Sequence, residues 1–149
     1  MKTINPLRYV FAYVLWFFTI GLGFLTADAA RVSVRSALIV AELDRYFIHA
    51  NSLIIVLLLG LASMAFMVVT EHLYRTAVPK NKLIPRFIQV TGWTLIVLAV
   101  MHLFHAVTIY VDTLLFPWFR LSATAIELVV GITFIWLSRR LSTKPVLVG

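Results

Sequence analysis

The sequence predicts an all-α integral membrane protein, a four-transmembrane-helix bundle, and three observations predict it. First, 62% of the 149 residues are apolar and the mean hydropathy is +0.98, whereas soluble domains are about 45–50% apolar. Second, four apolar segments each reach the roughly 20 helical residues that a hydrocarbon core of about 30 Å requires. Third, the basic residues lie at the ends of these segments, as membrane anchoring requires.

The four predicted spans are residues 9–27, 47–70, 87–111 and 118–137. Each is too long and too uniformly apolar for a soluble core helix, and none alternates like a barrel strand. We interpret residues 9–27 as a true span because this run is longer and more aromatic than the apolar region of a secretory signal. Since no internal repeat is present, we expect one domain over residues 1–149.

The connection over residues 28–46 has the pattern of a helix with two faces. Charged residues recur on one side of it and apolar residues on the other: Arg31, Arg35, Glu42 and Arg45 against Val32, Ile39, Val40 and Leu43. This pattern is typical of a short amphipathic helix in the membrane interface between spans 1 and 2. An extension of the second span is the alternative.

The charge distribution predicts an orientation. Of the 13 Lys and Arg residues, nine fall on the side of the two termini and four on the opposite side. The positive-inside rule then places both termini in the cytoplasm, and we expect a multi-pass protein of the cell inner membrane. Although the net charge is +7, basic residues flanking apolar spans indicate membrane anchoring and not nucleic-acid binding. The absence of cysteine excludes disulfides, thiolate metal sites and a Cys nucleophile.

Titratable residues interrupt the third and fourth spans. The stretch VMHLFHAVTIYVD, residues 100–112, places His102, His105 and Asp112 on one helical stripe. His49 begins the second span on the same membrane side, and Glu127 is about 15 Å into the fourth, near the depth of His102. Because such groups cost several kcal/mol in lipid unless they find a partner or water, we expect the polar atoms of His102 and Glu127 to lie within hydrogen-bond or one-water distance.

Four interpretations of this polar cluster stay open. His49 with His102 or His105 could ligate haem b between two helices. His102 and His105, completed by Glu127, Asp112 or His49, could instead hold Cu, Zn or Fe. Glu127 with the histidines could form a proton or ion path. Finally, these side chains could only hydrogen-bond one another and fix the helix register.

The run from His102 to Asp112 resembles the membrane anchors of succinate dehydrogenases, in which histidine and aspartate lie on one helix near haem and quinone. The resemblance covers that run alone. A haem held by these histidines would lie near one membrane surface, which would suit electron exchange with a quinone as partner. We expect a small, non-catalytic subunit or accessory protein of a larger membrane complex in the lipid bilayer, with electron transfer as the favoured process. The alternatives are a small homo-oligomeric proton or ion transporter or channel using Glu127, and a membrane metalloenzyme subunit. Neither a phosphate loop nor a nucleophile elbow is present.

Overall fold

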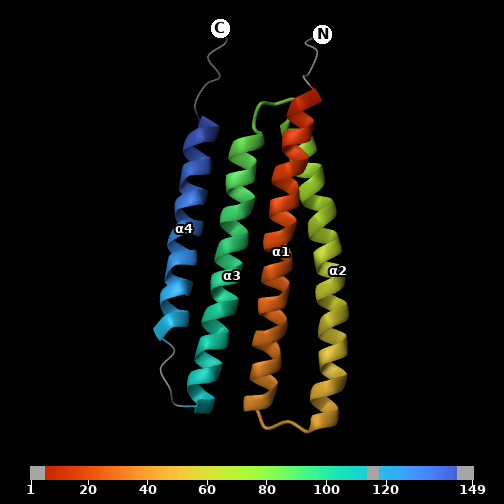
Figure 1. The fold of residues 1–149 in the computed structure, drawn as a ribbon, viewed down its shortest axis with the longest axis vertical. Helices are drawn as coiled ribbons and strands as arrows, with labels where there is room; N and C mark the ends of the chain where they lie inside the picture. The colour runs from red at the N-terminus through yellow and green to blue at the C-terminus, as the bar shows by residue number, and fades with distance from the viewer. Residues whose placement is uncertain (1–5, 114–117, 144–149) are drawn as a thin grey trace.

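The computed structural model describes residues 6–113 and 118–143, and nearly all of them are helical (Figure 1). The four helices are α1 (Pro6–Val40), α2 (Arg45–Ala77), α3 (Leu83–Thr113) and α4 (Trp118–Thr143). Each is long and apolar enough to cross a membrane, and the described ranges contain no strand. The predicted all-α fold with four spanning helices is confirmed, and the protein is a multi-pass membrane protein.

The helices are longer than the predicted spans. α1 has 35 residues and α2 has 33, which at 1.5 Å per residue gives lengths of about 50 Å. A hydrocarbon core of about 30 Å is therefore too thin to contain either helix. Part of each helix projects beyond the membrane or lies in its interface.

The separate amphipathic helix predicted between spans 1 and 2 is wrong. Residues 28–40 continue α1 without a break and belong neither to a helix of their own nor to the second span. The physical reason is the absence of any glycine or proline between residues 24 and 40, since these are the residues that end or kink helices. The chain turns only after Val40, where Glu42 adopts a left-handed φ of 52°.

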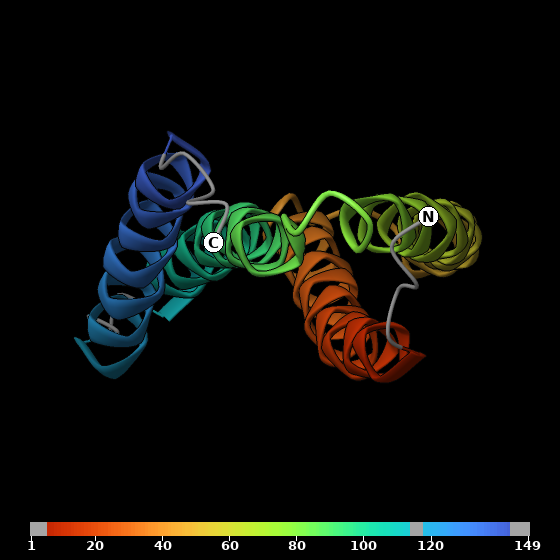
Figure 2. The same ribbon diagram turned by 90° about the horizontal axis from the view of Figure 1, so that it is seen from above.

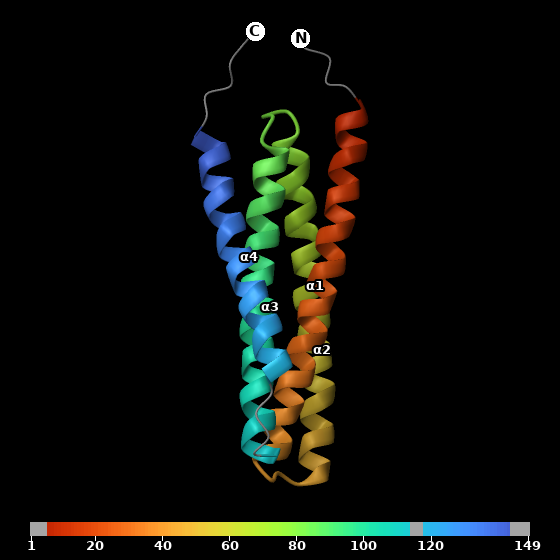
Figure 3. The same cartoon turned by 60° about the vertical axis from the view of Figure 1, so that its left-hand side comes forward.

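The four helices lie in a row and do not close around a central interior (Figures 1 and 2). α4 packs against α3, α3 against α1, and α1 against α2, while α2 touches α3 only slightly. Among the described residues, α4 contacts neither α1 nor α2. The row is best followed from above in Figure 2, and Figure 3 shows α1 and α4 diverging toward the end where the chain starts and finishes. We call this end the terminal end.

The contact between α3 and α4 depends on two glycines. A Cβ atom placed on Gly92 would lie 2.9 Å from the carbonyl oxygen of Gly131, and a Cβ on Gly131 would lie 2.9 Å from the carbonyl oxygen of Gly92. Both clashes involve backbone, which cannot rotate away as a side chain can. Small residues of this kind let membrane helices approach closely enough for extensive van der Waals contact. The glycine pair thus explains why α3 and α4 form the closest pairing of the row.

At the terminal end, α1 and α2 are joined around Tyr74. This side chain is only 1% exposed, and its hydroxyl lies 2.7 Å from the Thr19 hydroxyl. Thr19 donates its own hydrogen to the Leu15 carbonyl at 3.0 Å, so Tyr74 is the donor of the shared bond. In the same region the Trp16 indole donates to the Met67 carbonyl at 3.1 Å. These bonds fix the register of α1 on α2.

Tyr74→Phe tests the contribution of this hydrogen bond. We expect the free energy of unfolding to fall by about 1 kcal/mol, because Thr19 keeps its bond to Leu15 and no buried donor is left unpaired. Tyr74→Ala should cost about 3–5 kcal/mol through loss of the ring's packing. Denaturant unfolding in mild detergent measures both variants. Equal losses would contradict the division between ring packing and hydrogen bonding.

Candidate functional site

The candidate site begins with a hydrogen-bonded histidine–carboxyl pair between α3 and α4. The His102 Nδ1 atom lies 2.9 Å from Glu127 Oε2 and 3.1 Å from Oε1, so Nδ1 donates to Glu127 when the carboxyl group is ionised. The His102 side chain is 39% exposed and that of Glu127 is 22% exposed. The predicted hydrogen-bond proximity of these two residues is confirmed. Since Nδ1 carries the proton in this contact, Nε2 of a neutral His102 keeps its lone pair.

One turn further along α3, His105 is bonded to α1. Its Nδ1 atom lies 3.1 Å from the Ser36 hydroxyl. Because Ser36 donates its hydrogen to the Val32 carbonyl at 3.0 Å, the imidazole is the donor and its Nε2 also keeps a lone pair when the ring is neutral. The two histidines of α3 are thus held through the same ring atom, but by different neighbouring helices.

A buried serine strengthens the junction of α1 with α3. Ser33 is 0% exposed, and its hydroxyl contacts the Ala29 carbonyl at 2.7 Å and the Met101 carbonyl at 2.8 Å. The sequence analysis missed Ser33 and Ser36 because it assigned residues 28–46 to a separate element outside the spans. The available signal was the uninterrupted run of helix-compatible residues after Ala27, which carries both serines onto the α3 side of α1.

The structure does not bring the other predicted ligands to this pair. His49 is exposed on α2, which packs against α1 and not against α4. Asp112 lies in the last turn of α3, but its side chain falls outside the described part of the molecule. Among the residues that the structure describes, no three His, Asp or Glu side chains are close enough to hold a metal ion together. The site assembled here is therefore His102, Glu127 and, separately bonded, His105.

Packing contacts place part of α1 level with the middle of α2. A Cβ on Gly23 would lie 2.7 Å from the ring of Phe66. Further along α1, Asp28 and Arg31 border a groove whose other wall includes Gly60 of α2. Between His49 and Glu71, α2 carries no ionisable side chain, and Gly60 is the midpoint of this run.

The same comparison with α3 gives the same depth. Ser33 of α1 is level with Met101 of α3 through their hydrogen bond, so Asp28 lies about 7 Å nearer the terminal end, level with the apolar residues that precede Met101. Its position directly after the 9–27 run suggests instead that Asp28 lies at a membrane boundary. The packing contacts and the apolar run give different depths for Asp28 because α1 is long and continuous. Its charged second half lies beside the apolar segments of α2 and α3.

Three charged residues of α1 have no partner within the chain as described. Asp28, Arg31 and Arg35 are exposed, and none of them forms a hydrogen bond or ion pair with a described residue. Their spacing of three and four residues places them on one helical stripe. A charged side chain at the centre of a membrane helix costs about 2.5–3.5 kcal/mol on insertion scales and is normally paired or in contact with water. This stripe is a second polar feature, distinct from the His102–Glu127 pair.

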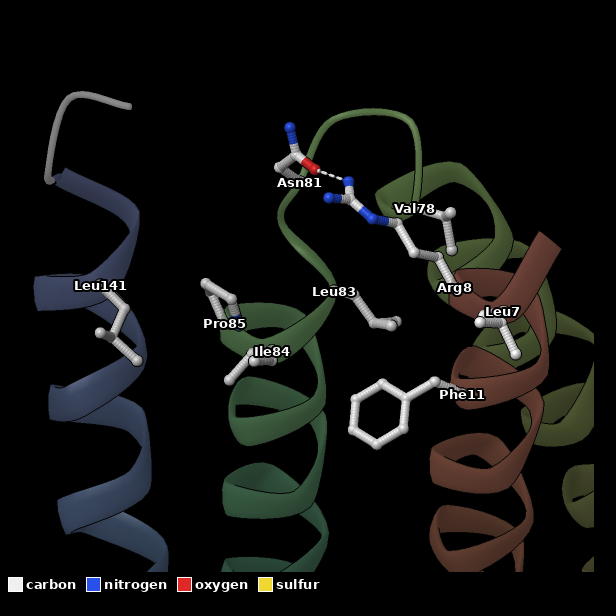
Figure 4. Close-up of a pocket in the computed structure, with 9 residues that line it drawn as sticks. All are labelled: Leu7, Arg8, Phe11, Val78, Asn81, Leu83, Ile84, Pro85 and Leu141. Carbon is white, nitrogen blue, oxygen red and sulfur yellow. Dashed lines mark hydrogen bonds between the residues drawn. The ribbon is translucent and has the colours of Figure 1, made fainter. Parts of the chain in front are cut away.

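A further groove lies at the terminal end, between α1, the start of α3 and α4 (Figure 4). It has a volume of about 510 Å³ and apolar walls. Its one charged side chain, Arg8, is bound to the side-chain oxygen of Asn81, as Figure 4 shows. The groove contains none of the predicted site residues, so we assign it no part in their chemistry.

Comparison with known proteins provides no relative from which residue roles could be transferred. No family model, curated protein or solved structure matches this chain. The functional argument therefore depends on the chain's own chemistry: one histidine–carboxylate pair, one histidine bonded to serine, and one stripe of unpaired charges.

Proposed function

We propose that this protein is a non-catalytic subunit of a membrane complex and that it acts by lateral association within the bilayer. The observation that carries this proposal is the unpaired stripe of Asp28, Arg31 and Arg35. Asp28 and Arg31 of this stripe are level with the apolar middle of α2. Charges in this position are stabilised by a protein partner that supplies opposite charges or excludes lipid. The open row of helices supports the same conclusion, because no other helix of the described chain covers the charged stripe of α1.

The native mass of the membrane-extracted protein tests this proposal. We expect wild-type protein in mild detergent to run as a particle larger than one chain, and the double variant Asp28→Ala, Arg31→Ala to run as a single chain. Glu42→Ala with Arg45→Ala removes the same pair of charges outside the groove and should leave the large particle intact. A monomeric wild type extracted under several mild conditions would overturn the proposal.

Proton handling is the second candidate function, and the His102–Glu127 contact favours it. A carboxyl group whose oxygen lies 2.9 Å from an imidazole nitrogen, with both groups partly exposed inside the membrane span, is an arrangement in which a proton can pass from one group to the other. Proton uptake by vesicles containing the purified protein tests this candidate. We expect Glu127→Gln to abolish uptake if the pair carries protons, whereas uptake equal to that of wild type would exclude Glu127 as a carrier.

Electron transfer through haem b or a metal ion stays a prediction from the sequence. His102 and His105 each keep an Nε2 lone pair that could bind a metal when the rings are neutral, but His49 lies on α2, which touches their helix α3 only slightly. A reduced-minus-oxidised absorption spectrum and metal analysis of the purified protein test it. An α-band typical of b haem, lost in His102→Ala or His105→Ala, would support it, and a colourless, metal-free sample would remove it.

A further inference from the structure

Two of the unpaired charges, Asp28 and Arg31, border a groove between α1 and α2. Its volume is about 310 Å³. The α1 wall includes Phe24, Asp28 and Arg31, and the α2 wall includes Gly60 and Ser63. No residue of α3 or α4 lines it, so it opens on the outer side of the row. Its charges lie on the α1 wall, and the α2 wall is apolar except for Ser63.

Two glycines, Gly60 in this groove and Gly21 one turn before Phe24, are not required by close packing inside the chain. Cβ atoms added to Gly23, Gly92 and Gly131 would all meet neighbouring atoms within 3 Å, so close packing explains these three glycines. A Cβ on Gly60 or on Gly21 would meet nothing within 4 Å. Gly21 shares a helical stripe with Asp28, since seven residues separate them. Because glycine is unfavourable in a helix interior, an unused glycine here indicates close approach by another helix.

The charge pattern of the groove in one copy of the chain is complementary to the same pattern in a second copy. Asp28 and Arg31 have opposite signs and lie about one helical turn apart on the same stripe. When two copies meet about a two-fold axis along the membrane normal, each presents the same face to the other. The Arg31 side chain of one copy can then reach Asp28 of the other, and the reverse pair forms at the same time. The two copies thus neutralise both mid-depth charges of each other, and no different protein is needed.

We propose that the α1–α2 groove is the contact surface for a second copy of this chain. The inference rests on the proposed function and names its partner. Two reciprocal Asp28–Arg31 ion pairs form at the centre, and Gly60 allows the α2 helices to approach closely. Arg35 lies one turn further from the terminal end, where its long side chain extends toward the membrane surface.

Disulfide cross-linking in native membranes tests the contact directly, because the chain has no cysteine of its own. Gly60→Cys should form a covalent dimer with a diffusible oxidant. Ala65→Cys is the matched control: it is exposed on the same helix and lies about 140° around it, so it should form several-fold less dimer. Equal cross-linking at both positions, or none at Gly60→Cys, would overturn the proposed contact.

Charge exchange tests the ion pairs. Asp28→Arg and Arg31→Asp should each reduce Gly60→Cys cross-linking several-fold, because each places like charges together. The double exchange should restore it, because the reciprocal pairs form again in reverse. Failure of the double variant to recover, with insertion and expression equal to wild type, would overturn the ion pairs.

Bulk at Gly60 gives a test that is independent of charge. Gly60→Leu should prevent dimer formation on a native gel while leaving the fold of each chain unchanged, because a Cβ atom at this position meets no atom of its own chain within 4 Å. Ala65→Leu is the control. If Gly60→Leu has no effect but the alanine double variant at Asp28 and Arg31 still dissociates a large particle, then another protein is the partner and only the second-copy inference fails. If the wild type is monomeric, both proposals fail.

Discussion

Gly131→Leu is expected to separate α4 from α3 and to lower the free energy of unfolding by about 3 kcal/mol or more. Overpacking a well-packed contact costs about 1–3 kcal/mol when side chains can adjust. Here the added Cβ alone would lie 2.9 Å from the Gly92 carbonyl oxygen and 3.3 Å from the Ile96 backbone nitrogen. Because these are backbone atoms, relief requires the helices to move apart. Denaturant unfolding in mild detergent measures the loss.

The control for this variant is Ala125→Leu. Ala125 is exposed on the same helix, so a leucine there projects away from α3 and should change stability by less than about 0.5 kcal/mol. Gly131→Leu should also weaken the contact of His102 with Glu127, because this contact joins the same two helices. Removing Glu127 from the Gly131→Leu protein should therefore cause little further loss of stability. A Gly131→Leu protein as stable as Ala125→Leu would contradict the close contact of Gly92 with Gly131.

The sequence predicts which polar residues need hydrogen-bond partners better than it predicts which helices carry those partners. His102 lies about two-thirds of the way along α3, and Glu127 about two-fifths of the way along α4. Because the two helices run in opposite directions, depth alone brings these residues together once a short connection joins the helices. His49 has the same polarity, but no residue pattern states whether α2 lies beside α3, the helix that carries His102 and His105. In the structure α1 occupies the place between α2 and α3, and it does so through Ser33, Ser36 and the terminal-end contact of Thr19 with Tyr74.

The depth of the charges on α1 is the other property that the sequence does not reveal. A charge directly after an apolar run marks the end of a span when the helix ends there. α1 continues for twelve residues past Asp28, to Val40, and its packing register then places Asp28 beside the middle of α2. Register depends on interhelical contacts such as Gly23 with the Phe66 ring, which involve residues distant in the chain. Hydrophobic periodicity within one helix contains no information about them.

Uncoupling His102 from Glu127 is the second large effect that we expect. A double-mutant cycle of His102→Ala and Glu127→Ala should give a coupling free energy of about 1–2 kcal/mol, near the upper end of measured membrane hydrogen bonds, because the imidazole contacts both carboxylate oxygens. His72→Ala combined with Glu127→Ala is the matched control. His72 is an exposed histidine on α2, which does not contact α4, so that cycle should be additive within about 0.5 kcal/mol.

Glu127→Gln distinguishes a structural role of the His102–Glu127 pair from a role in proton transfer. Glutamine keeps an acceptor oxygen for the His102 Nδ1 proton but cannot titrate. If the pair only joins α3 to α4, Glu127→Gln should retain most of the coupling, and vesicles containing it should behave as wild type. If the pair also carries protons, stability should be retained while proton uptake is lost. A coupling near zero in the alanine cycle would contradict a structural role, and then neither the close contact nor its charge would explain why an acid lies within α4.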